Sequence, residues 1–115
     1  MQLKIGTDIV LVKRIEESIE KFGQKFLNRF LSQEEQQIAK KVETIAAFWA
    51  AKEAVAKALG CGIGEELSFL DIAISKDSKG APHLRLINEA YQIKSSSLSL
   101  SHDGGFAIAV VALIL

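Results

Sequence analysis

Two carboxylates and a lysine stand out in this 115-residue chain because they interrupt apolar segments. Asp8 lies within the β-rich run LKIGTDIVLV (3–12), although aspartate is disfavoured in strands and seldom buried without a partner. Glu53 and Lys57 lie one turn apart on one flank of a predicted helix, FWAAKEAVAKALG (48–60). Mg²⁺ takes one or two protein carboxylates and completes its shell with water and substrate phosphates. The set therefore predicts a metal–phosphate site.

Each of these charges also has an ordinary structural interpretation. Glu53 and Lys57 form an i,i+4 pair in the favourable order, which stabilises an exposed helix by about 0.2–0.5 kcal/mol. Asp8 fits either an edge strand or a position where a backbone donor satisfies its carboxylate. Two carboxylates embedded in apolar elements favour the metal site over this interpretation.

The helix that carries Glu53 is apolar on two sides. At about 100° per residue, its large apolar residues form one broad face and its alanines form a second stripe opposite. The large residues are Ile45, Phe48, Trp49, Val55 and Leu59, and the alanines are Ala47, Ala51, Ala54 and Ala58. The alanine stripe is small enough for another backbone to approach closely, so we expect burial on both sides. Lys52 falls within the large apolar face, where its ammonium either reaches water or contacts a phosphate.

Periodicity and turn residues predict the elements that must position this site. A helix is expected over 13–23, and the capping box Ser32–Glu35 starts a second helix that runs to Leu59, with a break near 42–44. Strands are expected over 68–75 and 82–87, and a short helix over 88–96. Segments 97–101 and 106–115 form a hairpin across Asp103-Gly104. Helices and strands mix without regular βαβ alternation, which indicates the α+β class.

A glycine-rich loop, Gly60-Cys61-Gly62-Ile63-Gly64, follows the long helix. It follows a helix rather than a strand, so it is no dinucleotide-binding fingerprint. Gly60 is typical of a helix C-cap. Gly62 and Gly64 fit either a tight turn or a loop whose backbone N–H groups approach a phosphate.

Composition excludes several functions. The formal net charge is zero, which argues against general nucleic-acid binding. Zinc is not predicted, because His83 and His102 are far apart in sequence and Cys61 is the only cysteine. A single cysteine makes no internal disulfide and favours a reducing compartment.

The chain is expected to be one cytoplasmic domain, residues 1–115, with no membrane partner. Lys4 and Asp8 interrupt any apolar core of a signal peptide. The terminal run FAIAVVALIL (106–115) is too short to span a bilayer as a helix and is typical of a buried strand.

Four blocks, in order along the chain, resemble holo-acyl-carrier-protein synthase, the short bacterial type of 4′-phosphopantetheinyl transferase. The combination of an Asp in the first strand with a downstream Lys-Glu-Ala-x-x-Lys helix is specific to that family. The blocks are IGTDIVLVKRI (5–15), AAKEAVAKALGCGIG (50–64), LSFLDIAI (67–74) and SLSLSHDGGFAIAVV (97–111).

The resemblance implies an α+β fold in which a small antiparallel sheet packs with a long central helix. It implies a homotrimer with active sites at subunit interfaces. The implied reaction transfers 4′-phosphopantetheine from coenzyme A to a serine of apo-acyl carrier protein, releases 3′,5′-ADP and supports fatty acid biosynthesis. Mg²⁺ is the implied metal.

The resemblance also implies residue roles. Asp8 and Glu53 match the metal-binding carboxylates, and Lys57 matches a catalytic lysine that assists departure of ADP. The residues matched to coenzyme A binding are Lys57, Gly60, Gly62, Gly64 and His102. Those matched to carrier-protein docking are Arg14, Lys25, Phe26 and Arg29. From the residues alone, His102 is equally a hairpin-end residue, and the general base is either Glu53 or a metal-bound water.

Phe48 departs from the family pattern, because family members often carry an arginine there that contacts coenzyme A phosphate. That contact is then missing or comes from Lys40, Lys41 or Lys52. Two other function classes remain open from sequence. One is a non-catalytic oligomeric binding module with 106–115 as its interface strand, and the other is a different Mg²⁺-dependent enzyme such as a pyrophosphate hydrolase.

Overall fold

The computed structural model describes residues 1–87 and 90–115. Within these residues, four α-helices precede most of the strands: α1 Val12–Phe22, α2 Gln24–Phe30, α3 Gln33–Ile38 and α4 Val42–Leu59. The strands are β1 Leu3–Leu11, β2 Ile72–Lys76, β3 Pro82–Leu86, β4 Ser95–Asp103 and β5 Phe106–Ile114, and a 3₁₀ turn, η1 Phe69–Asp71, leads into β2. The predicted α+β class is confirmed.

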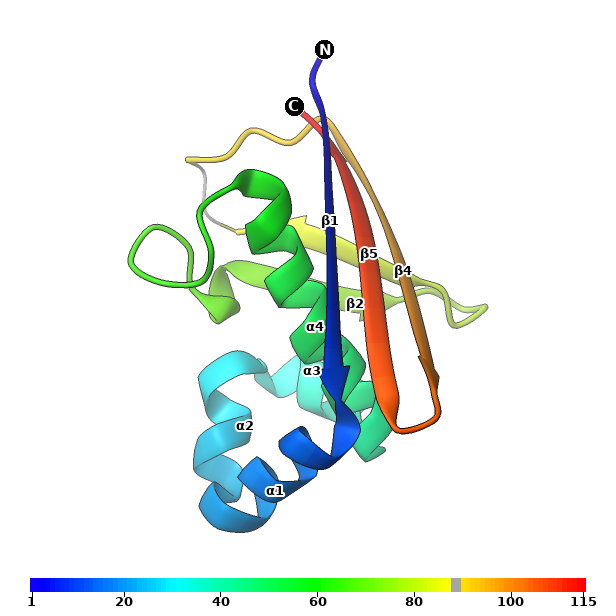
Figure 1. Ribbon diagram of the computed structural model, residues 1–115. Coiled ribbons are helices and arrows are strands. Elements are labelled where there is room, and N and C mark those ends of the chain that lie inside the picture. Colours follow the sequence, from blue (N-terminus) through cyan, green and yellow to red (C-terminus); the bar gives the residue numbers. More distant parts are fainter. Residues whose placement is uncertain (88–89) are drawn as a thin grey trace.

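The central helix α4 lies along one face of an antiparallel sheet with strand order β1-β5-β4 (Figure 1). Helices α1 and α2 gather at the end of the sheet where β1 finishes, and β2 and β3 form a separate antiparallel pair. Ser96 Oγ of β4 donates to the Leu84 carbonyl of β3 at 3.4 Å, which places the two sheets side by side. The predicted small sheet with a long central helix is therefore present.

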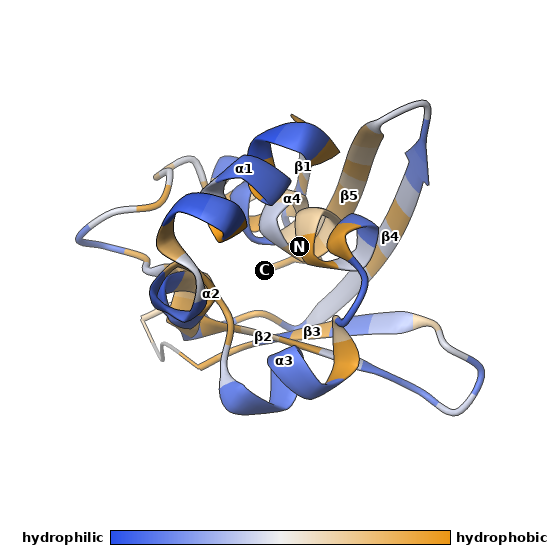
Figure 2. Ribbon diagram, turned by 90° about the horizontal axis from the view of Figure 1, so that it is seen from below, coloured by the Kyte–Doolittle hydropathy of each residue, from blue (hydrophilic) through white to orange (hydrophobic). Residues whose placement is uncertain are grey.

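Strands β1 and β5 are apolar on both faces of the three-stranded sheet, but only one face is covered. Residues of β1 and β5 that point toward α4 are buried, including Val10, Ala107, Ala109, Val111 and Leu113. Those that point the other way are exposed large apolar residues: Leu3, Ile5, Ile9, Leu11, Phe106, Ile108 and Val110. Figure 2 shows that β5 is apolar along its length, whereas α1 and α3 are mainly hydrophilic.

Gly6 is where β1 and α4 meet most closely. A Cβ placed on Gly6 would overlap the Ala54 carbonyl oxygen and would lie 2.8 Å from the Ala58 amide nitrogen. Both neighbours are backbone atoms, which side-chain rotation cannot remove. The alanine stripe of α4 is therefore a backbone contact surface, as its small residues predict.

The predicted hairpin and first helix are confirmed. Gly104 and Gly105 have φ angles of 58° and 85° at the turn between β4 and β5, and Asp103 pairs with Phe106. The predicted helix 13–23 corresponds to α1.

Two predicted boundaries are wrong, and one helix was not predicted. The helix beginning at Ser32 ends at Ile38, so the break falls at 39–41 rather than 42–44. Segment 24–30 forms α2, which was not predicted. The strand expected over 68–75 starts only at Ile72, after η1.

The short helix expected over 88–96 is also wrong for the residues described. Residues 90–94 are turn and irregular backbone, and 88–89 lie outside the described residues. Ser95 and Ser96 belong to β4 because they pair with Ile114 and Leu113 of β5. Across the described residues, no helix combines the length and hydropathy needed to cross a membrane.

The Gly6 contact gives a stability prediction. Gly6→Ala should lower the free energy of unfolding by about 3 kcal/mol, the upper end of ordinary overpacking costs, because the new methyl meets backbone. Urea denaturation measures this. Gly64→Ala is the matched control, since its added Cβ meets no heavy atom within 4 Å and needs no positive φ. Equal stability of the two variants would contradict the packing argument.

Candidate active site

Asp8 and Lys57 meet at the edge of the contact between β1 and α4. Asp8 lies two residues beyond Gly6 on the same face of β1, and Lys57 lies in the last turn of α4. The Lys57 Nζ donates to Asp8 Oδ1 at 2.8 Å. The Asp8 side chain is 15% exposed and that of Lys57 56%, so the ammonium reaches a half-buried carboxylate from solvent.

Glu53 completes the group one helical turn before Lys57. Burial raises the pKa of the Glu53 carboxyl, and the negative charge of Asp8 raises it further. The charges of Lys57 and of Arg14 on α1 act in the opposite direction on this pKa. The structure therefore brings together the three residues that the sequence predicts, and adds Arg14 to their electrostatic environment.

The donor set fits a hard divalent cation. Two carboxylates lie close enough that one disfavours ionisation of the other, which a bound cation would relieve. Among the described residues no group of three or more His, Cys, Asp or Glu side chains is placed to hold a metal. Two protein carboxylates with water and phosphate oxygens are the ligands usual for Mg²⁺.

The glycine loop is built as a helix terminus and turn. Gly60 has φ 76° and caps α4, and Gly62 has φ 68°. The Gly60, Gly62 and Gly64 amides donate to the carbonyls of Lys57, Ala56 and Leu67, respectively. These N–H groups already have acceptors, so they are not a free phosphate cradle. Because glycines have no side chains, this loop leaves an open surface next to Lys57.

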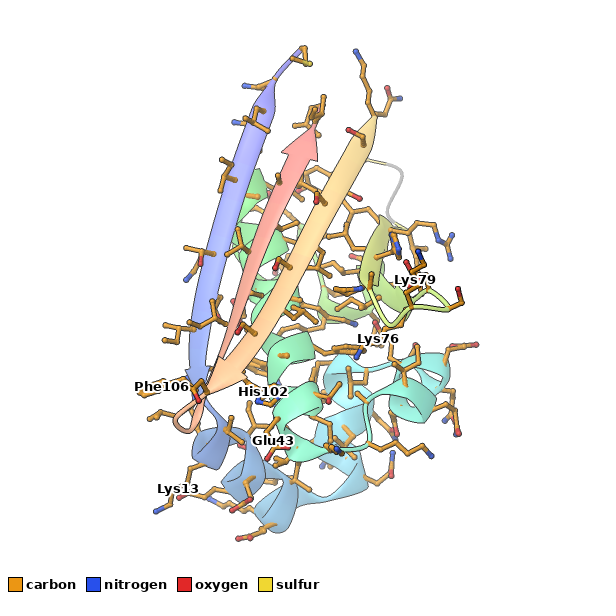
Figure 3. All side chains as sticks on the ribbon, turned by 90° about the vertical axis from the view of Figure 1, so that its right-hand side faces the viewer. Lys13, Glu43, Lys76, Lys79, His102 and Phe106 are labelled. Carbon is orange, nitrogen blue, oxygen red and sulfur yellow. The ribbon has the colours of Figure 1, made fainter. Side chains whose placement is uncertain are left out.

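His102 lies at the other end of α4. It lines a cavity of about 230 Å³ with Thr44, Ala47 and Lys76, and a second cavity with Glu43. Figure 3 shows His102 beside Glu43, near the start of α4, with Lys76 farther along the same side of the molecule. Glu53 and Lys57 lie in the C-terminal half of α4 on its β1 side. Within a single chain, His102 therefore lies away from the Asp8–Glu53–Lys57 group.

The predicted docking residues lie on α1 and α2. Lys25, Phe26 and Arg29 share a cavity of about 210 Å³ with Phe22. Phe26 is only 7% exposed, whereas Phe22 is 54% exposed. Phe22, which the sequence reasoning did not single out, is thus the more accessible apolar group. The sequence feature that indicates an exposed Phe22 is its position at the end of α1, next to Gly23.

Phe48 and Lys52 are both fully buried. Phe48 belongs to the core, so this position presents no group to a phosphate. Both interpretations of Lys52 are wrong, because its Nζ donates to Glu35 Oε1 at 2.8 Å and to the Phe30 carbonyl at 2.7 Å. Burial lowers the pKa of Lys52, while the bond to Glu35 opposes that shift. Lys40 and Lys41 are exposed just before α4 and stay candidates.

Comparison with known proteins decides the family. A model described as the 4′-phosphopantetheinyl transferase superfamily matches residues 4–111. Holo-[acyl-carrier-protein] synthase of Sulfurovum sp. (strain NBC37-1) is 59% identical over 114 residues, covering 96% of each chain. The chain belongs to the 4′-phosphopantetheinyl transferase superfamily. The resemblance that the four sequence blocks carry is thus confirmed.

Solved structures agree with this membership of the phosphopantetheinyl transferases. Helicobacter pylori holo-[acyl-carrier-protein] synthase in complex with coenzyme A has a TM-score of 0.93 and 53% identity, covering 96% of this chain and 99% of its own. The synthase of Bacillus anthracis in complex with CoA (3′,5′-ADP) has a TM-score of 0.83 and 41% identity, covering 96% and 94%.

The electrostatics of the Asp8–Glu53–Lys57 group give a pH prediction. Burial and Asp8 both penalise the charged form of Glu53, so on acidification Glu53 should protonate above the ordinary glutamate range. NMR titration of the side-chain carboxyl in metal-free protein measures the midpoint. Asp8→Asn should lower it, because one repulsive charge is removed, and Lys57→Met should raise it. A midpoint that is insensitive to both substitutions would show that the three groups do not interact.

Proposed function

We propose that this chain is a holo-acyl-carrier-protein synthase that transfers 4′-phosphopantetheine from coenzyme A to a serine of apo-acyl carrier protein and releases 3′,5′-ADP. The observation that carries the proposal is the meeting of Asp8, Glu53 and Lys57 from β1 and α4 in a chain of this superfamily. Relatives whose structures hold coenzyme A or 3′,5′-ADP support the substrate. The reaction fits a role in fatty acid biosynthesis.

Lys57 is proposed to act on the leaving group. In the transfer, the serine oxygen bonds to the β-phosphorus of coenzyme A, and the bond from that phosphorus to the oxygen bridging it to the 3′,5′-ADP portion breaks. The serine proton passes to a general base, either Glu53 or a water molecule. Negative charge then develops on the leaving phosphate, where an ammonium stabilises it or supplies a proton. The Asp8 carboxylate, 2.8 Å from Nζ, orients that ammonium.

Asp8 and Glu53 are proposed to hold Mg²⁺. When bound, the ion would offset charge on the phosphate oxygens. In its absence the two carboxylates repel each other, which agrees with the raised pKa of Glu53. Lys57 and Arg14 counter only part of that repulsion.

Coenzyme A is proposed to lie between two subunits. Its pyrophosphate would lie at Lys57 and the bare surface of Gly60, Gly62 and Gly64. The 230 Å³ cavity of His102 and Lys76, on a neighbouring subunit, would hold another part of the molecule. Since one chain keeps these groups on opposite sides of α4, an interface between copies is what would join them.

A homotrimer is proposed as the assembly that supplies this interface. The uncovered sheet face carries seven exposed large apolar residues on β1 and β5. Such a continuous apolar face is typical of a protein–protein contact. A trimer in which the subunits pack together through this sheet face would contain three equivalent sites.

The carrier protein is proposed to dock on α1 and α2. Arg14, Lys25 and Arg29 are exposed cations that complement an acidic carrier. Phe22 and Phe26 supply an apolar contact between them. We further propose that residues 1–115 act as one transferase domain in the cytoplasm, consistent with the free thiol of Cys61.

The transfer reaction is the main test. Incubation with coenzyme A, Mg²⁺ and apo-acyl carrier protein should add one phosphopantetheine to the carrier, detected by intact mass. Glu53→Gln should reduce the rate by at least about 100-fold, since the metal site loses a charged ligand, while circular dichroism shows the fold unchanged. Glu34→Gln, at an exposed position of α3, is the matched control and should keep full activity.

No adduct with the unaltered protein would overturn the proposed function. Cleavage of coenzyme A without transfer would indicate a pyrophosphate hydrolase instead.

The assembly is tested by sedimentation. The unaltered protein should sediment as a trimer, and Val110→Asp should produce monomers because it buries a charge in the proposed interface. Monomers should lose transfer activity although Asp8, Glu53 and Lys57 are unchanged. Ser78→Asp, in the exposed β2–β3 turn, adds the same charge away from the sheet face and should remain a trimer. A fully active monomer would contradict the shared site.

A further inference from the structure

A buried ion pair between Lys52 and Glu35 lies in the core, close to the proposed active site. Lys52 is 0% exposed and Glu35 is 1% exposed, and their charged atoms lie 2.8 Å apart. Lys52 immediately precedes Glu53 in α4. Nothing in the proposed chemistry uses this pair, so its burial needs another explanation.

The pair connects four segments through hydrogen bonds. Lys52 Nζ donates to the Phe30 carbonyl, the last residue of α2, at 2.7 Å. Glu35 Oε1 accepts from the Ser32 amide at 2.8 Å, and Oε2 accepts from the Ile74 amide of β2 at 2.9 Å. The end of α2, the start of α3, strand β2 and helix α4 are thus tied to one another at a single point.

Stability alone does not account for the pair. The cost of removing two charges from water commonly offsets their attraction, and apolar residues of similar volume are often as stabilising. The pair fixes the relative positions of the segments that it connects, because each hydrogen bond requires its partner at a defined distance and direction. In the described residues, no buried side-chain nitrogen or oxygen lacks a hydrogen-bond partner, so the connection is complete.

The connection joins the docking helix to the catalytic helix. α2 carries Lys25, Phe26 and Arg29, and α4 carries Glu53 and Lys57. Ring contacts reinforce the junction: Trp49 of α4 packs against Phe26 at 5.7 Å and against Phe30 at 5.1 Å between ring centroids. The Lys52 hydrogen bond to Phe30 adds a directional contact that fixes the end of α2.

We propose that Lys52 and Glu35 are positioning residues that hold α2 in register with α4, so that a carrier serine docked on α2 reaches the phosphate held at Glu53 and Lys57. The proposal rests on the proposed function. A displacement of about 1 Å in a reacting group can reduce a rate about 100-fold. Loss of the pair would also shift the α2 part of the docking surface relative to its α1 part. Carrier binding should therefore weaken together with the rate of transfer, while the coenzyme A contacts on α4 are kept.

The test measures steady-state kinetics of Glu35→Gln and Lys52→Met, with Lys52→Arg as the conservative variant. We expect the KM for apo-acyl carrier protein to rise at least about tenfold in the first two variants. The dissociation constant for coenzyme A should stay within about twofold. Lys52→Arg keeps the charge and several donors, and should recover part of the lost carrier affinity.

Leu113→Ala is the control for general destabilisation. Leu113 is fully buried in β5 and pairs with Lys4 at the end of the sheet remote from α2. A smaller folded fraction lowers the apparent kcat but not KM, so this variant should keep the carrier KM of the unaltered protein. Assays are run at a temperature where circular dichroism shows every variant folded.

Carrier KM values within twofold of the unaltered protein in both pair variants would overturn the proposal. So would an equal rise in carrier KM for Leu113→Ala. If Lys52→Met does not fold, Glu35→Gln decides, because it keeps the size of the side chain and one oxygen acceptor. An inactive unaltered protein would instead be a failure of the proposed function, which the mass assay detects separately.

Discussion

The close contact between Gly6 and the backbone of α4 is the constraint on which the site depends. A Cβ at this position would overlap the Ala54 carbonyl oxygen, so only glycine allows β1 and α4 to approach as they do. Asp8 follows two residues later on the same face, and its carboxylate then meets the ammonium of Lys57. A strand held farther away would separate Asp8 from Glu53, the two carboxylates proposed to hold the metal.

The same packing explains why the site is divided. α4 covers one face of the sheet and leaves the other apolar face open, which favours assembly of several copies. The helix also separates the Asp8 edge of the sheet from the His102 cavity on β4. The proposed association of copies would cover the open apolar face and bring the two parts of the proposed site together.

The sequence predicts features that depend on neighbouring residues better than those that depend on distant ones. Asp8, Glu53 and Lys57 are visible as charges in apolar elements, and the Ser32–Glu35 cap follows from a four-residue pattern that the structure contains. Ser95 and Ser96 are different, because pairing with β5 makes them strand whatever their local preference. The capping pattern already accounts for a glutamate at position 35. Nothing in the sequence therefore predicts that Glu35 also pairs with Lys52, 17 residues away.

Lys52 and Glu53 show how α4 serves two surfaces at once. Successive residues of a helix point about 100° apart, so one side chain enters the junction with α2 and β2 while the next reaches toward β1. Phe48, one turn earlier, lies wholly in the core. Because α4 is a continuous 18-residue helix, its core-facing side and the side that carries Glu53 keep a fixed relation to each other. The hydrogen bond from Lys52 to Phe30 therefore fixes the position of α2 relative to Glu53, without any contact between Lys52 and substrate.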